Sequence, residues 1–168
     1  KRCSCLIKQR GIINMAYLDL NTQFGLGHTE FSDVFQTEAG TTIGYTRKNL
    51  ALTATAGTTI EIGTILEDNG DGTASIPATT AAITNPVIYC GDDPYRQQAA
   101  GKRDWNPNTT VFTADNLTQD VVVVYRGRVG VGKAYLVFPS DAATATKQAV
   151  YDLLDAKGFK IIRQVAKY

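Results

Sequence analysis

The sequence predicts a mainly β domain of the α+β class, with one C-terminal helix and an extended N-terminal arm. Threonine occupies 21 and glycine 15 of the 168 positions, a composition that favours strands and turns over helices. Short apolar segments separated by turn residues follow one another from Gly40 onward, whereas a helical period occurs only after Pro139. With 43% hydrophobic residues, the chain can bury the core of one domain.

The charge balance excludes several classes of partner. Lysine and arginine number 17 and aspartate and glutamate 16, which leaves a formal charge of +1. Such a chain has no overall positive field to attract nucleic acid or an anionic membrane surface. No stretch approaches the ~20 consecutive apolar residues of a membrane-spanning helix. We therefore expect a soluble protein with neither a nucleic-acid nor a membrane partner.

Residues 1–14 precede the only methionine, Met15, and we interpret them as a non-native or upstream extension. They contain no apolar region of signal-peptide length, whereas the sequence from Met15 onward is typical of an ordinary translation start. Two of the three cysteines, Cys3 and Cys5, lie in this extension, so no disulfide framework is predicted. They are too close together for a tetrahedral zinc site and lack a second ligand pair.

Residues 15–39 form the predicted arm. Aromatic and aliphatic side chains here stand among polar residues and glycines without a sustained strand or helix period. Such side chains are candidates for docking on another protein. An equally open alternative is that they pack back onto their own domain. The candidate contact residues are Tyr17, Leu18, Leu20, Phe24, Phe31, Val34 and Phe35.

The next part of the domain, residues 40–78, predicts successive short strands. Within residues 58–66 an alternation of apolar and polar residues is interrupted at Gly63, as at a bulge or bend. The loop 68–72 then supplies residues that tolerate a positive φ. Residues 73–77 can therefore return as the partner strand of a hairpin.

Residues 91–110 are a polar insertion that contains two prolines and the only tryptophan, and we expect a surface loop. Two buried strands are predicted after it, at residues 121–126 and 134–138. The three glycines of residues 127–133 mark the connection between these strands.

One segment predicts a helix. After Pro139, either Ser140 or Asp141 can serve as N-cap, and Gly158 stands where a C-cap glycine belongs. A final strand at residues 159–165 closes the domain, which therefore spans residues 40–168. The apolar residues on one face of the predicted helix are Ala145, Ala149, Val150, Leu153 and Leu154.

The segment Gly127–Lys133 has the G-x-x-x-x-G-K spacing of a phosphate-binding loop, but its context does not fit. Ala134 stands where a Ser or Thr hydroxyl must hold magnesium. A strand pattern follows in place of the helix whose amides would face a phosphate. A strand connection containing glycines is the better interpretation.

Residues 67–72 have the oxygen ligands and the glycine of the first half of a calcium-binding loop. Ala78, however, occupies the position of the bidentate glutamate at the end of such a loop. A hairpin turn explains the same residues, with weak calcium binding at the surface as the alternative. We expect no metal site and no cofactor.

Candidate catalytic residues are few. His28 is the only histidine, and no serine has the G-x-S-x-G context of a hydrolase nucleophile. Cys90 and His28 could form a nucleophile and base, but a lone cysteine after an apolar pair is more often a small buried residue. Two acidic pairs, at 92–93 and at 152 and 155, do not suggest a tuned acid and base. The sequence therefore predicts no catalytic residues and no enzyme.

The order of elements in the last third of the chain resembles the lambda-type head decoration proteins of tailed bacteriophages. The elements are a valine-rich strand, a glycine connection, a strand ending in an aromatic residue and proline, an alanine-rich helix and a closing strand. The matching segments lie within residues 56–66 and 121–163. They are AGTTIEIGTIL from Ala56 to Leu66, VVVVYRG from Val121 to Gly127, AYLVFP from Ala134 to Pro139, and LLDAKGFKIIR from Leu153 to Arg163.

The resemblance implies a small β-tulip or barrel-like domain that forms homotrimers on the outer surface of an expanded capsid. These trimers would sit at threefold and quasi-threefold positions of the virion, after assembly in the bacterial cytoplasm, with the major capsid protein as partner. Members of the family use an N-terminal arm to add a strand to a capsid-protein sheet. This would assign capsid binding to the candidate residues of the arm. Residues 1–14 and the length of loop 91–110 have no counterpart in the family.

Two other functions stay open. A receptor- or glycan-binding β domain of a virion surface protein would share the strands rich in threonine and glycine, and would use Tyr95 and Trp105 as ligand contacts. A small hydrolase would use Cys90 or the acidic pair at 92–93. A capsid cement fits better, because it needs no reactive groups and gains strength when a trimer engages several weak sites together.

Overall fold

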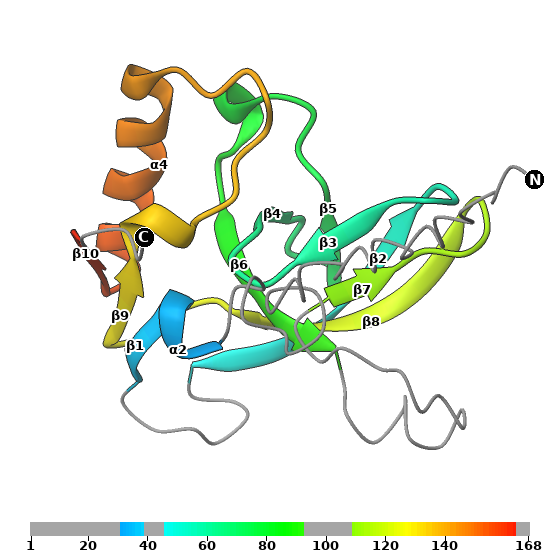
Figure 1. Ribbon diagram of the computed structural model, residues 1–168, viewed down its shortest axis with the longest axis horizontal. Coiled ribbons are helices and arrows are strands. Elements are labelled where there is room, and N and C mark those ends of the chain that lie inside the picture. The colour runs from blue at the N-terminus through cyan, green and yellow to red at the C-terminus, as the bar shows by residue number, and fades with distance from the viewer. Residues whose placement is uncertain (1–30, 39–45, 93–108, 164–168) are drawn as a thin grey trace, which may run out of the picture.

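The computed structural model describes residues 31–38, 46–92 and 109–163, which fold mainly as strands, as predicted (Figure 1). The strands are β1 (Phe35–Glu38), β2 (Arg47–Ala54), β3 (Thr59–Glu61), β4 (Ile65–Asp68), β5 (Thr73–Ser75), β6 (Pro86–Asp92), β7 (Thr109–Val111), β8 (Leu117–Val124), β9 (Val129–Gly132) and β10 (Phe159–Ile162). The helices are α2 (Phe31–Val34), α4 (Thr144–Ala156) and two 3₁₀ turns, η1 (Thr80–Ala82) and η2 (Lys133–Tyr135).

Five strands close into a barrel in the order β2-β5-β4-β6-β8, which confirms the barrel-like fold class. The long strands β2 and β8 pair along their whole length, from Arg47↔Val124 to Ala54↔Leu117. Strands β3 and β7 form a separate two-stranded sheet, and Ile60 of β3 and Phe112, the residue after β7, join the barrel core. The other members of this core are Leu50, Leu52, Leu66, Ala74, Val87, Tyr89, Val121 and Val123.

A second core lies between the barrel, helix α4 and a sheet of order β1-β9-β10. In that sheet β9 is the central strand, antiparallel to β1 and parallel to β10. Figure 1 shows α4 standing on the same side of the molecule as β9 and β10. Strand β6 separates the two cores, because Val87 and Tyr89 belong to the barrel core and Ile88 and Cys90 to the second.

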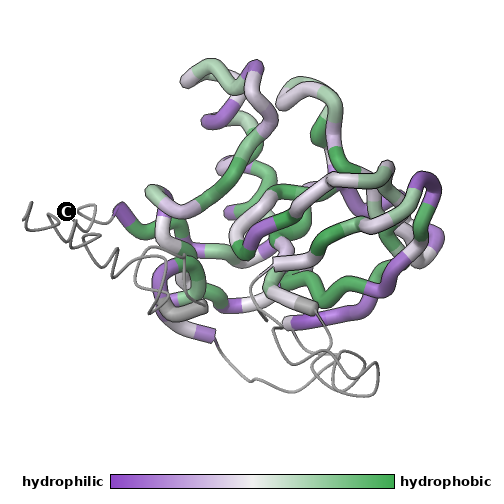
Figure 2. The backbone as a smooth tube through the Cα atoms, turned by 45° about the vertical axis from the view of Figure 1, so that its right-hand side comes forward, coloured by the Kyte–Doolittle hydropathy of each residue, from purple (hydrophilic) through white to green (hydrophobic). Residues whose placement is uncertain are grey.

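The hairpin and the bend predicted between residues 58 and 77 are confirmed. β4 and β5 pair antiparallel, and Gly70 and Gly72 in their loop have φ of 81° and 90°. Gly63, with φ of 90°, separates β3 from β4. Figure 2 shows the resulting pattern as short hydrophobic stretches interrupted by hydrophilic turns.

The structure corrects the assignment of strands around residue 130. The predicted glycine connection is itself the buried central strand β9, whereas residues 134–138 form no strand beyond a single bridge between Val137 and Thr64. Glycine suits β9 because its neighbours approach closely. A Cβ at Gly130 would lie 2.5 Å from Thr37 Oγ1 and 2.9 Å from Ile162 Cδ1.

The helix is confirmed, but its start and its buried face differ from the prediction. It begins at Thr144 after Ala143, without a side-chain cap, because the Asp141 carboxylate instead accepts from the backbone N–H and hydroxyl of Thr80. The buried helix residues are Val150, Tyr151 and Leu154, whereas Leu153 is half-buried and Ala145 and Ala149 are exposed. Gly158, with φ of 93°, follows the helix as predicted. None of the helices in the described residues has the length and apolar character needed to cross a membrane.

The end of the predicted arm belongs to the domain. Residues 31–38 form α2 and β1, and Val34 and Phe35 are 0% and 4% exposed within the second core. Tertiary packing therefore sets the domain boundary before residue 40. The surface loop predicted at residues 91–110 is also shorter, because residues 91–92 lie in β6 and residues 109–110 lie in β7. Residues 93–108 and the earlier part of the arm lie outside the described residues.

Candidate functional site: an apolar groove beside strand β3

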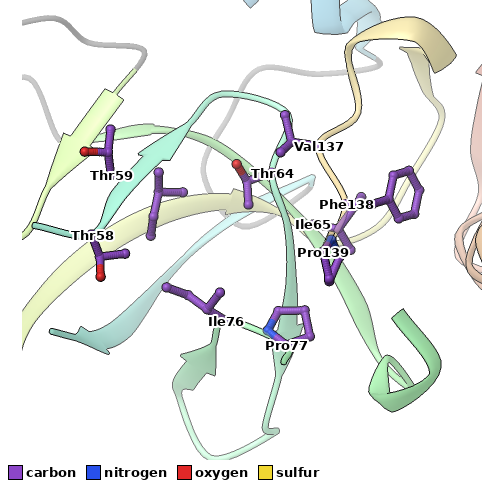
Figure 3. Close-up of a pocket in the computed structure, with 10 residues that line it drawn as sticks. Thr58, Thr59, Thr64, Ile65, Ile76, Pro77, Val137, Phe138 and Pro139 are labelled. Atoms are coloured by element: carbon purple, nitrogen blue, oxygen red, sulfur yellow. The ribbon is translucent and has the colours of Figure 1, made fainter. Parts of the chain in front are cut away.

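A groove of about 190 Å³ opens on the surface beside strand β3 (Figure 3). Its walls come from β3, the start of β4, the end of the β4–β5 hairpin and the connection that leads to α4. The lining residues are Thr58, Thr59, Ile60, Thr64, Ile65, Ile76, Pro77, Val137, Phe138 and Pro139. Because no ionisable side chain lines the groove, it offers apolar contact rather than acid–base chemistry.

Glycine at position 63 shapes one end of the groove. Its positive φ turns the chain sharply between β3 and β4, and a Cβ there would collide with the carbonyl oxygen of Tyr135. The close approach lets Val137 donate to the Gly63 carbonyl at 3.0 Å, and Ile65 donate to the Val137 carbonyl at 3.0 Å. These two bonds fix the wall that carries Val137 against the wall that carries Thr64.

Three large hydrophobic side chains are exposed among the described residues, and all three flank β3. Ile76 and Val137, at 41% and 43% exposure, line the groove. Val111, at 49%, pairs with Thr59 across the β3–β7 ladder and so projects on the same face as that groove residue. We call Ile76, Val111, Val137 and the groove the β3 apolar surface. Exposed apolar side chains gathered around one strand favour a protein contact.

The edge of strand β3 adds hydrogen-bonding capacity to this surface. Among the described residues β3 pairs with β7 alone, so its second edge has no strand neighbour. In an antiparallel pair, alternate residues direct their N–H and C=O groups away from the partner strand. The surface can therefore contact apolar side chains and the backbone of an extended segment together.

Charged side chains around the barrel make structural contacts. Asp68 forms an ion pair with Lys48, and Lys157 donates to the Pro86 carbonyl at 2.7 Å. Burial raises the pKa of Asp68, but hydrogen bonds from Lys48 and the Gly70 amide, with the charges of Lys48 and Lys157, lower it more. Its pKa therefore lies below the usual value, and the group stays ionised at neutral pH. A carboxylate held in this way is unsuited to general acid catalysis.

The residues considered for metal and phosphate binding have other roles. Within the part of the chain that the structure describes, no three His, Cys, Asp or Glu side chains lie together as a metal site requires. The candidate calcium loop is the β4–β5 turn, where Asp71 accepts from the Thr73 amide at 2.9 Å. The candidate phosphate loop runs into β9, and Ala134 after it lies in η2.

Cys90 is a buried residue of β6, as the sequence suggests for a lone cysteine. Burial raises its pKa to about 12, and the nearby charge of Arg47 opposes this only in part. A thiol that stays protonated at neutral pH is a poor nucleophile. Its proposed partner His28 lies outside the described residues, as do Tyr95 and Trp105.

The structure separates the predicted contact residues into two groups. Val34 and Phe35 are core residues and cannot reach a partner in this conformation, so the alternative that arm side chains pack on their own domain holds for both. Phe31 begins α2. Tyr17, Leu18, Leu20 and Phe24 lie outside the described residues. The sequence did not predict Ile76, Val111 and Val137 as contact residues, because an apolar side chain in a strand-like segment is expected to be buried.

Comparisons with protein-family models, curated proteins and solved structures found no match to this chain. The function is therefore inferred from the residues, the fold and the β3 apolar surface.

Proposed function

We propose that this chain is a capsid decoration protein that binds the outer surface of an expanded phage head. It acts as a homotrimer at threefold and quasi-threefold positions, where it holds neighbouring subunits of the major capsid protein together against internal DNA pressure. It is a structural protein without catalytic residues, metal or cofactor.

The β3 apolar surface is the observation that carries this proposal. Ile76, Val111 and Val137 are exposed around strand β3, whose second edge has no strand neighbour in the part of the chain that the structure describes, and no charged side chain lines the groove beside Ile76 and Val137. A surface of this composition suits contact with a protein, either a second copy or a capsid subunit. It lacks the charged and amide groups that a small polar ligand needs for orientation.

The fold gives further support. β8, α4 and β10 follow one another as in the resemblance to the head decoration family, whereas the strand expected at 134–138 is replaced by η2 and an extended connection, and the strand before it is β9. The five strands of the barrel close on one another, so the barrel itself has no open edge of the kind through which β-proteins associate non-specifically. A barrel of this kind suits a protein exposed on the outside of a virion.

In this proposal, residues 15–30 supply the second contact. The arm joins the domain at α2, directly before the edge strand β1 of the three-stranded sheet. Tyr17, Leu18, Leu20 and Phe24 remain the proposed capsid-binding side chains, with Phe31 at the junction. A trimer that carries three arms engages several sites together, so a modest affinity for each arm gives tight overall binding.

Co-sedimentation tests the proposal directly. The purified protein is mixed with expanded heads, and separately with unexpanded precursors, of the phage that encodes it. The expected result is saturable binding to expanded heads alone. Ile76→Asp and Val137→Asp should abolish trimer formation or head binding, whereas the control Ala149→Asp, on the exposed side of α4, should have no effect. A monomer that binds neither kind of head would contradict the proposal.

A receptor- or glycan-binding domain is the alternative, with Tyr95 and Trp105 as contacts. Binding of the isolated protein to a glycan array, without binding to heads, would favour it. The apolar character of the described surface favours the decoration role, because sugar hydroxyls require polar partners.

A further inference from the structure

The turn between β4 and β5 contains the only Asn-Gly pair of the chain, Asn69-Gly70. Both residues are exposed. An asparagine followed by glycine is the sequence most prone to deamidation, because glycine has no side chain to hinder attack by its own backbone nitrogen on the asparagine side chain. The turn therefore contains a group that can react with water alone.

The folded turn holds both reacting groups by hydrogen bonds. Asn69 Nδ2 donates to Thr73 Oγ1 at 2.8 Å, and Asn69 Oδ1 accepts from Ser75 Oγ at 3.2 Å. Both ends of the carboxamide are thus tied to strand β5. The attacking atom is also engaged, because the Gly70 amide donates to Asp68 Oδ1 at 3.0 Å. The reaction requires the carboxamide carbon to swing toward the Gly70 nitrogen, which breaks these contacts.

We infer that Asn69 is a deamidation site gated by the β4–β5 hairpin: the closed hairpin protects it, and an opened hairpin exposes it to irreversible conversion. The Gly70 nitrogen forms a bond to Cγ of Asn69, and the side-chain nitrogen leaves as ammonia with the proton from Gly70. Water then breaks one of the two C–N bonds of the cyclic imide. Cleavage at Cγ gives aspartate, and cleavage at the main-chain carbonyl gives isoaspartate.

The product affects the barrel, because β5 pairs with both β2 and β4. A carboxylate at position 69 loses the donor to Thr73 and stands between two further acidic residues, Asp68 and Asp71. Isoaspartate also lengthens the backbone of the turn by one carbon, which disturbs the register that pairs Asp68 with Ala74. A molecule whose β4–β5 hairpin has opened and whose Asn69 has reacted therefore keeps the changed residue, and its hairpin closes less well. This inference is independent of the proposed function.

The test follows the replacement of NH2 by OH at Asn69 by peptide mass mapping. This mass change also distinguishes the reaction from isomerisation at Asp71, which leaves the mass unchanged. The full chain is incubated at mildly alkaline pH, folded in buffer or unfolded in urea. Because the rate follows the population of the open form, conversion should be at least about tenfold slower in the folded chain. Asn116, which is followed by leucine, should stay intact in both samples.

Variants test the gate itself. Thr73→Val and Ser75→Ala each remove one tether of the carboxamide and should accelerate conversion in the folded chain several-fold, without changing the rate in urea. The matched control is Thr53→Val, which removes the hydroxyl pair of Thr53 and Thr118, 2.8 Å apart, outside the hairpin. Equal deamidation rates in folded and unfolded chains, or no effect of either tether variant, would contradict the protection of Asn69 by the closed hairpin. An unreactive Asn69 in urea would overturn the site.

Discussion

The single Nε–H of Arg47, at the start of β2, is shared between the two carboxylate oxygens of Glu38, at the end of β1, with N···O distances of 2.9 and 3.2 Å. Arg47 Nη2 forms an ion pair with the same carboxylate, and the hydroxyl of Thr46 donates to it. The Glu38 side chain is only 6% exposed. This contact joins the three-stranded sheet to the barrel.

Replacement of Glu38 by glutamine should destabilise the protein by about 1.5 to 3 kcal/mol at neutral pH, the range for hydrogen bonds to a charged group. Burial raises the pKa of Glu38, but the hydrogen bonds from Arg47 and Thr46 and the charge of Arg47 lower it more. The folded pKa therefore lies below the ordinary 4.5. The contribution is complete above that value and is lost as the pH falls through the folded pKa.

Urea unfolding of the wild type and Glu38→Gln at neutral and at acidic pH measures this effect. The difference in free energy of unfolding should shrink as the solution is acidified. A difference that stays constant into the acid range would contradict the assignment of the stabilisation to the ionised carboxylate.

Deletion of residues 1–30 should preserve cooperative unfolding, whereas deletion of residues 1–39 should not. The longer deletion removes Val34 and Phe35 from the second core, and truncation of one such side chain typically costs ~2 to 5 kcal/mol. It also removes Glu38. Thermal unfolding followed by circular dichroism compares the two deletions. Equal midpoints would show that β1 contributes nothing to the core.

Leu154→Ala should cost ~2 to 5 kcal/mol, because the side chain is completely buried. Leu153→Ala should cost clearly less, because the Leu153 side chain is only half-buried. Chemical denaturation of both variants gives the comparison. A larger loss at Leu153 would mean that the helix packs through a different face.

Cys90 should resist alkylation in the folded protein and react on unfolding, because burial keeps its thiol protonated at mildly alkaline pH. The deletion of residues 1–30 leaves it as the only thiol of the chain. Mass spectrometry after iodoacetamide treatment, with and without urea, measures the modified fraction. Rapid labelling of the folded protein would place the thiol at the surface.

Within the proposed capsid role, Phe24→Ala should weaken head occupancy far more than Lys160→Gln, an exposed charge on β10. A buried aromatic anchor is commonly worth ~2 kcal/mol or more, and an exposed ion pair ~1 or less. Binding should also depend only modestly on salt. Steep salt dependence, combined with normal binding of Phe24→Ala, would contradict binding by strand addition and would indicate an electrostatic contact.

Local signals predicted the hairpin at residues 68–72, the bend at Gly63 and the glycine after the helix, because each depends on a positive φ that glycine adopts readily. Strand β9 could not be predicted in the same way. Gly130 is glycine because Thr37 and Ile162 approach it, and both come from distant parts of the chain. The role of Asp141 could not be predicted either, because its carboxylate accepts a hydrogen bond from the distant Thr80 and does not cap helix α4. The β3 apolar surface depends on which apolar residues the fold leaves uncovered.

The position of β9 between β1 and β10 has a consequence for the synthesis of the protein. All five barrel strands, β2 to β8, precede β9 in the chain and are available to pair first. The second sheet needs β1 from near the start of the chain and β10 from near its end, so it closes only after residue 162 has left the ribosome. Until then Val34 and Phe35 lack their full set of neighbours. Translation that stops early therefore yields a chain with the barrel strands but with an exposed second core, a ready substrate for proteases.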